Sequence, residues 1–359
     1  MSVARKIRVL VVDDSAVVRR MITEALSQDS EIEVVGTACD PFVARDKILE
    51  LNPDVLTLDI EMPRMDGLTF LRILQQHRPM PVIIISSISQ AGSRAALDAI
   101  EFGAVDVLAK PRSAWNLGEL RADLARRVKT AMTAQLKNLH PPSTGVAPLQ
   151  ANGENFNARQ LIVIGASTGG TEAIKDVLTH LPTSLPGILI VQHIPPVFSK
   201  TFAERLNAVC ALEVREAVQG DVVQPGLALV APGDFHMAVN WENNSYRVQL
   251  RQDPPIHHTR PAVDMLFNSA ARCAGANAVG VLLTGMGRDG AQGMKQLKTA
   301  GATNLVQNEA TCVVYGMPGA AVELGVAHRI LPLDQIPQAI LHTLATRPAR
   351  RLEKTAALK

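Results

Sequence analysis

The chain has 359 residues, of which 47% are apolar and 19% are charged. This length favours two domains of ordinary size, and the apolar content excludes a largely disordered polymer. The formal net charge of +2 is small for such a chain and gives no sign of the broad basic surface of a duplex-binding protein, so we expect no nucleic-acid partner.

No uninterrupted apolar run is long enough to cross a bilayer, and the N-terminal residues lack a cleavage-site pattern. We therefore expect a cytoplasmic protein without direct membrane insertion. The four cysteines are far apart and show no zinc or redox spacing, which predicts reduced, buried thiols.

The first third of the chain alternates short apolar runs with stretches of helical period, a rhythm typical of a parallel sheet covered by helices. The apolar runs are Ile7–Val12, Ile32–Val35, Val55–Leu58, Val82–Ile85 and Val105–Ala109. The helix-like stretches are Val17–Leu26, Pro41–Leu49, Leu68–Gln76, Ser93–Phe102 and Leu117–Lys129. This pattern predicts one α/β domain with five parallel strands over residues 1–128.

Residues 129–158 break this rhythm and collect Pro, Gly, Ser, Thr and Asn, as an interdomain linker does. A second, doubly wound α/β domain is expected over residues 159–347, followed by a basic tail at 348–359. Its strands are expected at Leu161–Ile164, Ile188–Val191, Ala228–Val230, Ala278–Leu283 and Thr303–Val306, and its helices near Glu172–His180, Val263–Ala274 and Ala291–Thr299. A β-hairpin is expected where His236–Asn240 and Arg247–Leu250 flank a turn-rich segment.

Polar side chains follow the strands of the first domain at the edge where an open parallel sheet binds ligands: Asp13, Asp14, Asp59, Ser86 and Lys110. Clustered carboxylates repel one another unless a hard cation such as Mg²⁺ lies among them. Asp59 could then accept a phosphoryl group, neutralised by Mg²⁺ and Lys110 and hydrogen-bonded by Ser86. A single such aspartate would more often cap a helix or shape a turn.

Together these residues resemble the response-regulator receiver family, whose fold is flavodoxin-like. The matching segments are Val12–Asp13–Asp14–Ser15, Asp59 with Met62–Pro63–Arg64–Met65–Asp66–Gly67, Ser86, and Lys110–Pro111. The resemblance implies phosphorylation of Asp59, Mg²⁺ held by Asp13, Asp14 and Asp59, and a phosphoryl contact from Lys110. Many receivers carry an aromatic residue where this chain has Val107, so the usual aromatic switch is in question.

The second domain opens with an apolar strand followed by Gly165–Ala166–Ser167–Thr168–Gly169–Gly170. A dinucleotide-binding turn is disfavoured because the Gly-x-Gly-x-x-Gly pattern is missing, and a phosphate-binding P-loop lacks its Gly-Lys-Ser/Thr. A tight turn with a capping serine remains the structural alternative. The functional alternative is an exposed serine nucleophile near a helix N-terminus.

Two further groups favour the nucleophile. His193 follows one predicted strand and Asp289 follows another, so Ser167 shares a sheet edge with an imidazole and a carboxylate. Ser167 would attack a carbonyl carbon, His193 would take its proton, and Asp289 would orient the imidazole. Backbone amides near Thr168 or Met286 could receive the oxyanion, and Arg260 could line a substrate groove.

This domain resembles the catalytic domain of chemotaxis protein-glutamate methylesterases. The matching segments are Gly165–Gly170, Gln192–His193–Ile194, Arg260–Asp264, Gly285–Gly290, and Gln307 to Pro318. The resemblance implies hydrolysis of glutamate methyl esters on chemoreceptor helices with release of methanol, and deamidation of receptor glutamines. It also implies a chemotaxis histidine kinase as phosphodonor, an unphosphorylated receiver packed over the active site, and no cofactor in the esterase site.

Two other classes of function remain as alternatives. A phosphorylation-dependent adaptor would have a second domain without catalysis, which the intact Ser167, His193 and Asp289 disfavour. A receiver-linked DNA-binding regulator would need a basic helix-turn-helix pattern, and the second half of the chain instead has an α/β pattern.

Overall fold

The chain forms two compact units, which divide between Pro142 and Ser143. The computed structural model describes residues 5–87, 89–110, 117–136, 149, 156 and 159–346. Most of the predicted linker and the predicted tail lie outside these residues, so the domain limits drawn from the sequence stay predictions. In the described part of the chain, no helix combines the length and apolarity needed to cross a membrane.

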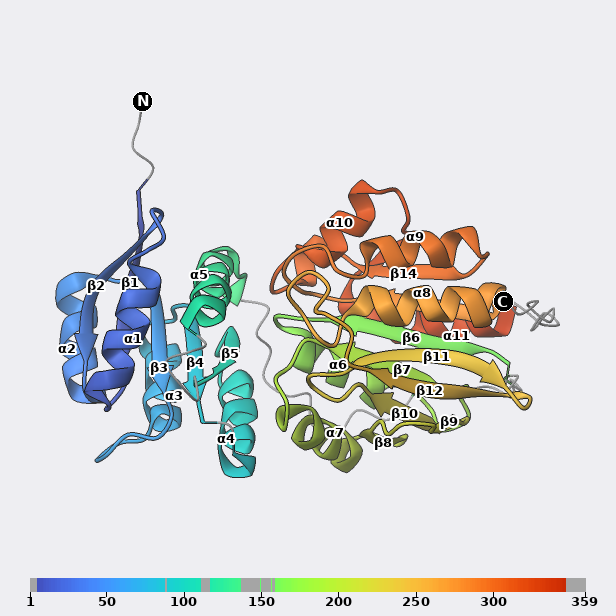
Figure 1. Ribbon diagram of the computed structural model, residues 1–359, viewed down its shortest axis with the longest axis horizontal. Helices are drawn as coiled ribbons and strands as arrows, with labels where there is room; N and C mark the ends of the chain where they lie inside the picture. The colour runs from blue at the N-terminus through green and yellow to red at the C-terminus, as the bar shows by residue number, and fades with distance from the viewer. Residues whose placement is uncertain are drawn as a thin grey trace. The chain divides into compact units, whose positions relative to one another are not determined.

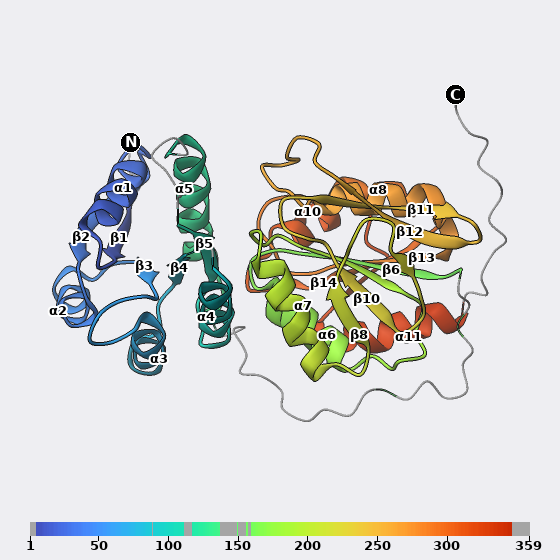
Figure 2. The same ribbon diagram turned by 60° about the horizontal axis from the view of Figure 1, so that its bottom comes forward.

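The first unit is a parallel sheet in the order β2-β1-β3-β4-β5, covered by helices on both faces (Figures 1 and 2). Its elements are β1 (Ile7–Val12), α1 (Ala16–Leu26), β2 (Ile32–Ala38), α2 (Pro41–Leu51), β3 (Val55–Asp59), α3 (Gly67–His77), β4 (Val82–Ser86), α4 (Gln90–Glu101), β5 (Asp106–Ala109) and α5 (Leu117–Thr133). Each strand and helix predicted here is confirmed. Helix α5 continues to Thr133, beyond the predicted limit at residue 128.

The core of this unit explains why its strands read as continuous apolar runs. Strands β1, β3 and β4 lie in the middle of the sheet, with helices on both faces, so nearly all their side chains are buried. On one face, Val9 and Ile83 pack with Leu26 of α1 and Leu124 of α5. Apart from Arg8 and Thr57, the polar residues of these three strands lie at the carboxyl ends of β3 and β4, which is where the predicted phosphorylation pocket lies.

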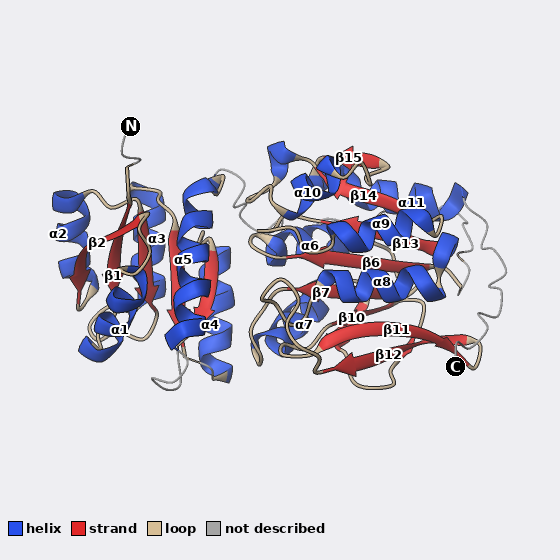
Figure 3. Ribbon diagram, turned by 45° about the horizontal axis from the view of Figure 1, so that its top comes forward, coloured by secondary structure: helices blue, strands red, loops and turns tan. Residues whose placement is uncertain are grey.

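The second unit contains a seven-stranded sheet in the order β15-β14-β13-β6-β7-β10-β8, in which neighbouring strands run parallel (Figure 3). Its strands are β6 (Leu161–Ala166), β7 (Ile188–Gln192), β8 (Glu213–Glu216), β10 (Leu227–Val230), β13 (Ala278–Leu282), β14 (Thr303–Gln307) and β15 (Arg329–Leu331). Its helices are α6 (Gly170–Thr179), α7 (Phe198–Val209), α8 (Val263–Cys273), α9 (Ala291–Thr299), α10 (Met317–Glu323) and α11 (Ile336–Thr346), with short 3₁₀ turns at Gly275–Asn277, Glu309–Thr311 and Leu333–Gln335. The predicted doubly wound α/β architecture is confirmed.

The predicted hairpin forms from β11 (His236–Glu242) and β12 (Ser245–Arg251). Asn243 and Asn244 make its two-residue turn, both with positive φ, as a turn matching the twist of the strands requires. A third strand, β9 (Val222–Val223), pairs with β12. Helix α8 packs against β11, so the hairpin covers the helix whose N-terminus lies at the candidate site.

The cysteine prediction is correct for the redox state and wrong for burial. All four thiols are free, but Cys312 alone is buried, Cys39 is exposed, and Cys210 and Cys273 are half-buried. Cys39 lies in the turn between β2 and α2, at the surface edge of the sheet, where no core is available to cover it.

Candidate functional site

Three carboxylates meet at the edge of the first sheet, as predicted. Oxygens of Asp13, Asp14 and Asp59 lie within 4.8 Å of one another; Asp13 and Asp59 are buried and Asp14 is exposed. Lys110 reaches in from the end of β5, with its Nζ 2.7 Å from Asp59 Oδ2 and 3.0 Å from Asp13 Oδ2. The five predicted residues of this pocket therefore share one end of the sheet, with Ser86 buried at the end of β4.

The electrostatics of this pocket favour a bound cation. Burial is the main cause of a raised pKa at Asp59; the Lys110 ammonium counteracts it, and the Asp13 charge adds to it. Asp13 Oδ2 and Asp59 Oδ2 are buried, and among the described residues their partners are the ion pairs with Lys110. Carboxylate oxygens with spare acceptor capacity at this spacing fit a hard divalent cation such as Mg²⁺.

Ser86 and Val107 lie next to this pocket. The Ser86 hydroxyl donates to the Gly92 carbonyl oxygen of α4 at 3.3 Å, so it connects the pocket edge with that helix. Val107 is buried in β5, and its carbonyl oxygen accepts from Arg127 Nη1 of α5 at 3.3 Å. The aliphatic Val107 therefore packs within the core, at the place where an aromatic ring would be expected to move.

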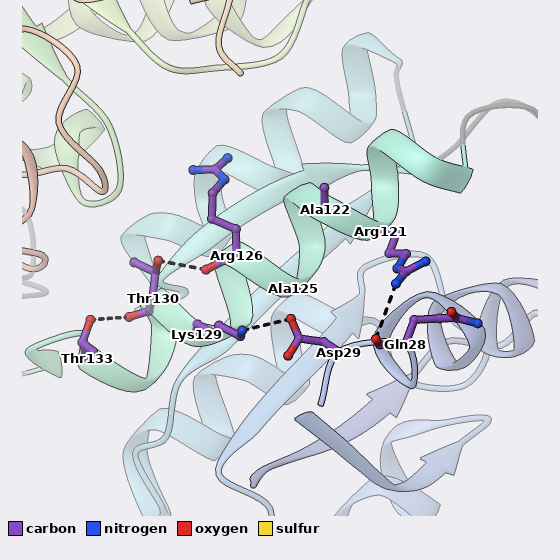
Figure 4. Close-up of a pocket in the computed structure, with 9 residues that line it drawn as sticks. All are labelled: Gln28, Asp29, Arg121, Ala122, Ala125, Arg126, Lys129, Thr130 and Thr133. Carbon is purple, nitrogen blue, oxygen red and sulfur yellow. Dashed lines mark hydrogen bonds and ion pairs between the residues drawn. The ribbon is translucent and has the colours of Figure 1, made fainter. Parts of the chain in front are cut away.

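A separate surface pocket of about 530 Å³ lies between α5 and the turn after α1 (Figure 4). Its basic side chains have partners: Lys129 lies 2.9 Å from Asp29 Oδ2, and Arg121 donates to the Gln28 carbonyl oxygen at 3.4 Å. None of the predicted site residues lines it. It is at the other end of the sheet from Asp59, so it is not the phosphorylation pocket.

In the second unit, Ser167 lies on the turn that joins β6 to α6. Gly169 precedes the helix with φ +76°, a conformation that favours glycine, and a Cβ there would lie 2.6 Å from the Val313 side chain. The turn places the half-exposed Ser167 beside the N-terminus of α6. A hydroxyl there lies close to the positive end of a helix dipole, which favours a developing oxyanion.

His193 and Asp289 form the hydrogen-bonded pair that the sequence predicts. His193 Nε2 lies 2.8 Å from Asp289 Oδ2; the His193 side chain is 9% exposed and that of Asp289 is 2% exposed. Their strands, β7 and β13, flank β6 in the sheet, so the loops after three neighbouring strands carry Asp289, Ser167 and His193.

Asp289 is held as a charged acceptor by the N-terminus of α8. Its Oδ2 accepts from the Val263 amide at 2.7 Å, and its Oδ1 accepts from the amides of Asp264 and Gly290, each at 2.9 Å. Burial alone would raise the pKa of Asp289, but the hydrogen bond and charge of His193, with these amides, lower it overall. The carboxylate therefore stays ionised and can orient the imidazole.

Ser167 and His193 each follow the last residue of a strand, and those two last residues, Ala166 and Gln192, are paired in the sheet across β6 and β7. The His193 amide donates to the Ala166 carbonyl oxygen at 3.1 Å. Because Nε2 contacts Asp289, Nδ1 is the ring nitrogen left to face a hydroxyl. Within the described residues, no hydrogen bond joins the Ser167 hydroxyl to His193; such contacts are often long in unliganded enzymes and tighten with substrate.

The predicted oxyanion residues lie next to Ser167. Thr168 follows it directly, and the loop carrying Met286 packs against it so closely that a Cβ on Gly285 would lie 2.8 Å from Ser167 Cβ. Thr284 holds the two segments together: its carbonyl oxygen accepts from the Ser167 amide at 3.0 Å, and its hydroxyl lies 3.0 Å from the Thr168 carbonyl oxygen. These two bonds join the Ser167 turn to the loop that carries Met286.

Arg260, the predicted substrate contact, is engaged within the protein. Its Nε lies 3.0 Å from Asp234 Oδ1, and its Nη1 lies 3.1 Å from the Asp253 carbonyl oxygen. The side chain is 23% exposed, so these bonds tie two loops together at the surface. A contact with substrate remains a prediction for this residue.

Two buried glutamines hold the site; both lie in the segments that carry the resemblance, but the sequence pattern gave neither a role. Gln307 Oε1 accepts from the Thr284 amide at 2.7 Å, and Gln192 Nε2 donates to the Ser167 carbonyl oxygen at 2.8 Å. Both are the last residues of apolar strands, where a polar side chain is the signal that could have drawn attention to them. Their partners could not be predicted without the turn geometry.

A serine on a strand-to-helix turn, beside a buried His–Asp pair, is the arrangement of a serine hydrolase, here following a receiver-type unit with an acidic pocket. Residues 162–340 match the family of CheB methylesterases, and residues 9–122 match the response regulator receiver domain. The chain belongs to the CheB methylesterase family, in the form that carries a receiver domain. The resemblance drawn from the motifs is therefore confirmed.

Named relatives agree with this assignment. A protein-glutamate methylesterase/protein-glutamine glutaminase of Syntrophus aciditrophicus is 50% identical over 341 residues, 94% of this chain and 98% of the relative. One of Salmonella choleraesuis is 48% identical over 97% of this chain and 99% of its own length. The crystal structure of the Thermotoga maritima CheB methylesterase catalytic domain matches with a TM-score of 0.50 and 38% identity, covering 51% of this chain and 97% of that domain.

Proposed function

We propose that this chain is a phosphorylation-controlled serine hydrolase that removes methyl groups from glutamate methyl esters on chemoreceptors and also deamidates receptor glutamines. Relatives named protein-glutamate methylesterase/protein-glutamine glutaminase that match nearly the whole chain support the activity. The observation that carries the mechanism is the 2.8 Å contact between His193 Nε2 and Asp289 Oδ2, beside the turn of Ser167. The compartment that fits this function is the cytoplasm, where receptor helices and a chemotaxis histidine kinase are both reachable.

In this proposal, the Ser167 oxygen attacks the ester carbonyl carbon while His193 takes the hydroxyl proton. His193 returns the proton to the departing methoxy oxygen, which leaves as methanol, and water then hydrolyses the acyl-serine by the reverse proton path. Asp289 stabilises the imidazolium, and amides of Thr168 and Met286 serve the oxyanion. A glutamine substrate follows the same steps with ammonia as the leaving group.

The receiver unit would supply control through Asp59. Its carboxylate accepts a phosphoryl group from the kinase, and Lys110 and Ser86 contact that group. Mg²⁺, when held by Asp13, Asp14 and Asp59, neutralises charge on the phosphoryl oxygens. Phosphorylation then raises hydrolysis at Ser167 by reorganising loops at the edge of the sheet.

The direct test is a methanol-release assay with receptor-bearing membranes that carry glutamate methyl esters. The proposal predicts methanol in proportion to enzyme, and faster release when a small-molecule phosphodonor and Mg²⁺ are added. The adaptor alternative predicts phosphorylation-dependent receptor binding without methanol. Binding with no methanol at any enzyme concentration would reject the hydrolase in favour of the adaptor.

Removing Mg²⁺ is expected to block phosphorylation of Asp59, because Asp13 and Asp59 would keep repelling the incoming phosphoryl oxygens. Intact-protein mass spectrometry after incubation with phosphodonor should show one added phosphoryl group with Mg²⁺ and none with a chelator. The basal esterase rate should not change with the chelator. Equal phosphorylation in both conditions would show that the acidic cluster works without the cation.

A further inference from the structure

Gln192 is the last residue of β7 and is 4% exposed. Its Nε2 donates to the Ser167 carbonyl oxygen at 2.8 Å and to the His193 carbonyl oxygen at 3.3 Å. One amide group thus contacts the backbone of the proposed nucleophile and of the proposed base.

The sheet ends at this point, and the glutamine continues it. The last backbone bond across β6 and β7 is that from the His193 amide to the Ala166 carbonyl oxygen, at 3.1 Å. The Ser167 amide turns the other way and donates to Thr284, beside β13. On the β7 side, the Gln192 side chain supplies a donor beyond this last backbone bond and reaches the Ser167 carbonyl oxygen.

The Gln192 side-chain amide is closely packed, and only its NH₂ group has hydrogen-bond partners among the described residues. A Cβ on Gly170 would lie 2.2 Å from Gln192 Oε1, so a residue larger than glycine would displace the amide. Gln192 Oε1 is itself buried and accepts no hydrogen bond from the described residues, an arrangement that costs free energy. The two hydrogen bonds that Nε2 donates, to the carbonyl oxygens of Ser167 and His193, offset this cost.

We propose that Gln192 is a positioning residue that sets the separation between the Ser167 hydroxyl and the His193 imidazole. The proposal rests on the function proposed above for those two residues. Without the amide, the Ser167 turn keeps its backbone bonds to Thr284 and Gly170 but loses its side-chain link to β7, and we expect the hydroxyl to shift relative to the imidazole. A misplacement of about 1 Å between reacting groups costs on the order of 10²-fold in rate.

The test compares Gln192→Met and Gln192→Glu with the wild type. Methionine keeps the volume and removes both donors; glutamate keeps the shape and turns a carboxylate oxygen toward two carbonyl oxygens. We expect kcat for methanol release to fall about 10²-fold in Gln192→Met and at least as far in Gln192→Glu, with KM for receptor changed little. Because a loss of folded protein also lowers the apparent kcat without changing KM, kcat is expressed per folded enzyme, with the folded fraction measured by circular dichroism at the assay temperature. A lower kcat on that basis, at constant KM, marks positioning.

Gln160 offers a matched control, because it is a buried glutamine at the opposite end of β6 whose Nε2 donates to the Leu344 carbonyl oxygen at 2.8 Å. Gln160→Met and Gln160→Glu should lower Tm and leave kcat unchanged at temperatures well below Tm. Unchanged kcat in both Gln192 variants, or an equal kcat loss in the Gln160 variants, would overturn the inference. Ser167→Ala is assayed alongside: an active Ser167→Ala enzyme would instead remove Ser167 from the proposed mechanism, and a wild-type enzyme that releases no methanol would reject the proposed function.

Discussion

Ser167→Ala is expected to lower kcat for methanol release by about 10⁴-fold to 10⁶-fold, because the attacking oxygen is removed. The fold should be kept. The Ser167 amide donates to Thr284, and its carbonyl oxygen accepts from Gly170 and Gln192, so these three hydrogen bonds use backbone atoms that alanine also has. The assay is methanol release from methylated receptors at saturating substrate.

Ser269→Ala is the matched control for this substitution. The Ser269 hydroxyl is buried, donates to the Leu266 carbonyl oxygen and accepts from the Val239 amide, away from the site. Its loss should cost about 1 kcal/mol of stability and leave kcat unchanged. Methanol release by Ser167→Ala within tenfold of the wild type would remove Ser167 from the mechanism.

Asp289→Asn is expected to lower kcat by about 10⁴-fold with little change in KM. Both carboxylate oxygens of Asp289 accept hydrogen bonds, Oδ1 from two backbone amides and Oδ2 from His193 and Val263. An asparagine that keeps its oxygen toward the two amides turns its NH₂ group toward His193 Nε2. The imidazole proton then moves to Nδ1, which can no longer take the Ser167 proton.

Asp221→Asn tests whether any bonded carboxylate would give this loss. Asp221 accepts from both terminal nitrogens of Arg215 and from the Val218 amide, in the same unit but outside the candidate site. That variant should lose stability and keep kcat. If Asp289→Asn kept more than a tenth of the wild-type kcat, the orienting role of Asp289 would be rejected.

The receiver unit was predictable from sequence because its strands are short and covered on both faces. A short, continuous apolar run such as Val82–Ile85 is typical of a buried parallel strand. The residues that follow such strands lie at one edge of the sheet, because parallel strands all end there. The same logic placed Ser167 and His193 correctly at the ends of β6 and β7. Asp289 lies further from its strand, and the structure brings it back to the site, where it contacts His193.

Several elements of the second unit were not predicted. The edge strands β8 and β15 contain exposed, charged residues such as Glu213 and Arg329, so they lack the apolar run that marks a strand. Helix α7 begins after two prolines, where a loop is the simpler expectation. An edge strand has a neighbour on one side only, so local sequence constrains it less than a central strand.

The side-chain contacts that hold the site together could not be predicted from the sequence either. Arg260 could be predicted as a groove residue from its motif, but its bonds to Asp234 and Asp253 depend on how two loops meet. Gln192 and Thr284 act through backbone atoms of Ser167, and backbone acceptors carry no sequence signal. A strand pattern predicts which residues share an edge, whereas the turn geometry decides which of them bond.

The central claim is that phosphorylation of Asp59 controls hydrolysis at Ser167, and the most direct measurement is methanol release by wild type and Asp59→Asn, each with and without phosphodonor and Mg²⁺. The account predicts that phosphodonor raises the wild-type rate and leaves Asp59→Asn at its basal rate. Equal stimulation of both proteins would contradict it, and so would a wild-type rate that ignores the phosphodonor while mass spectrometry shows Asp59 phosphorylated.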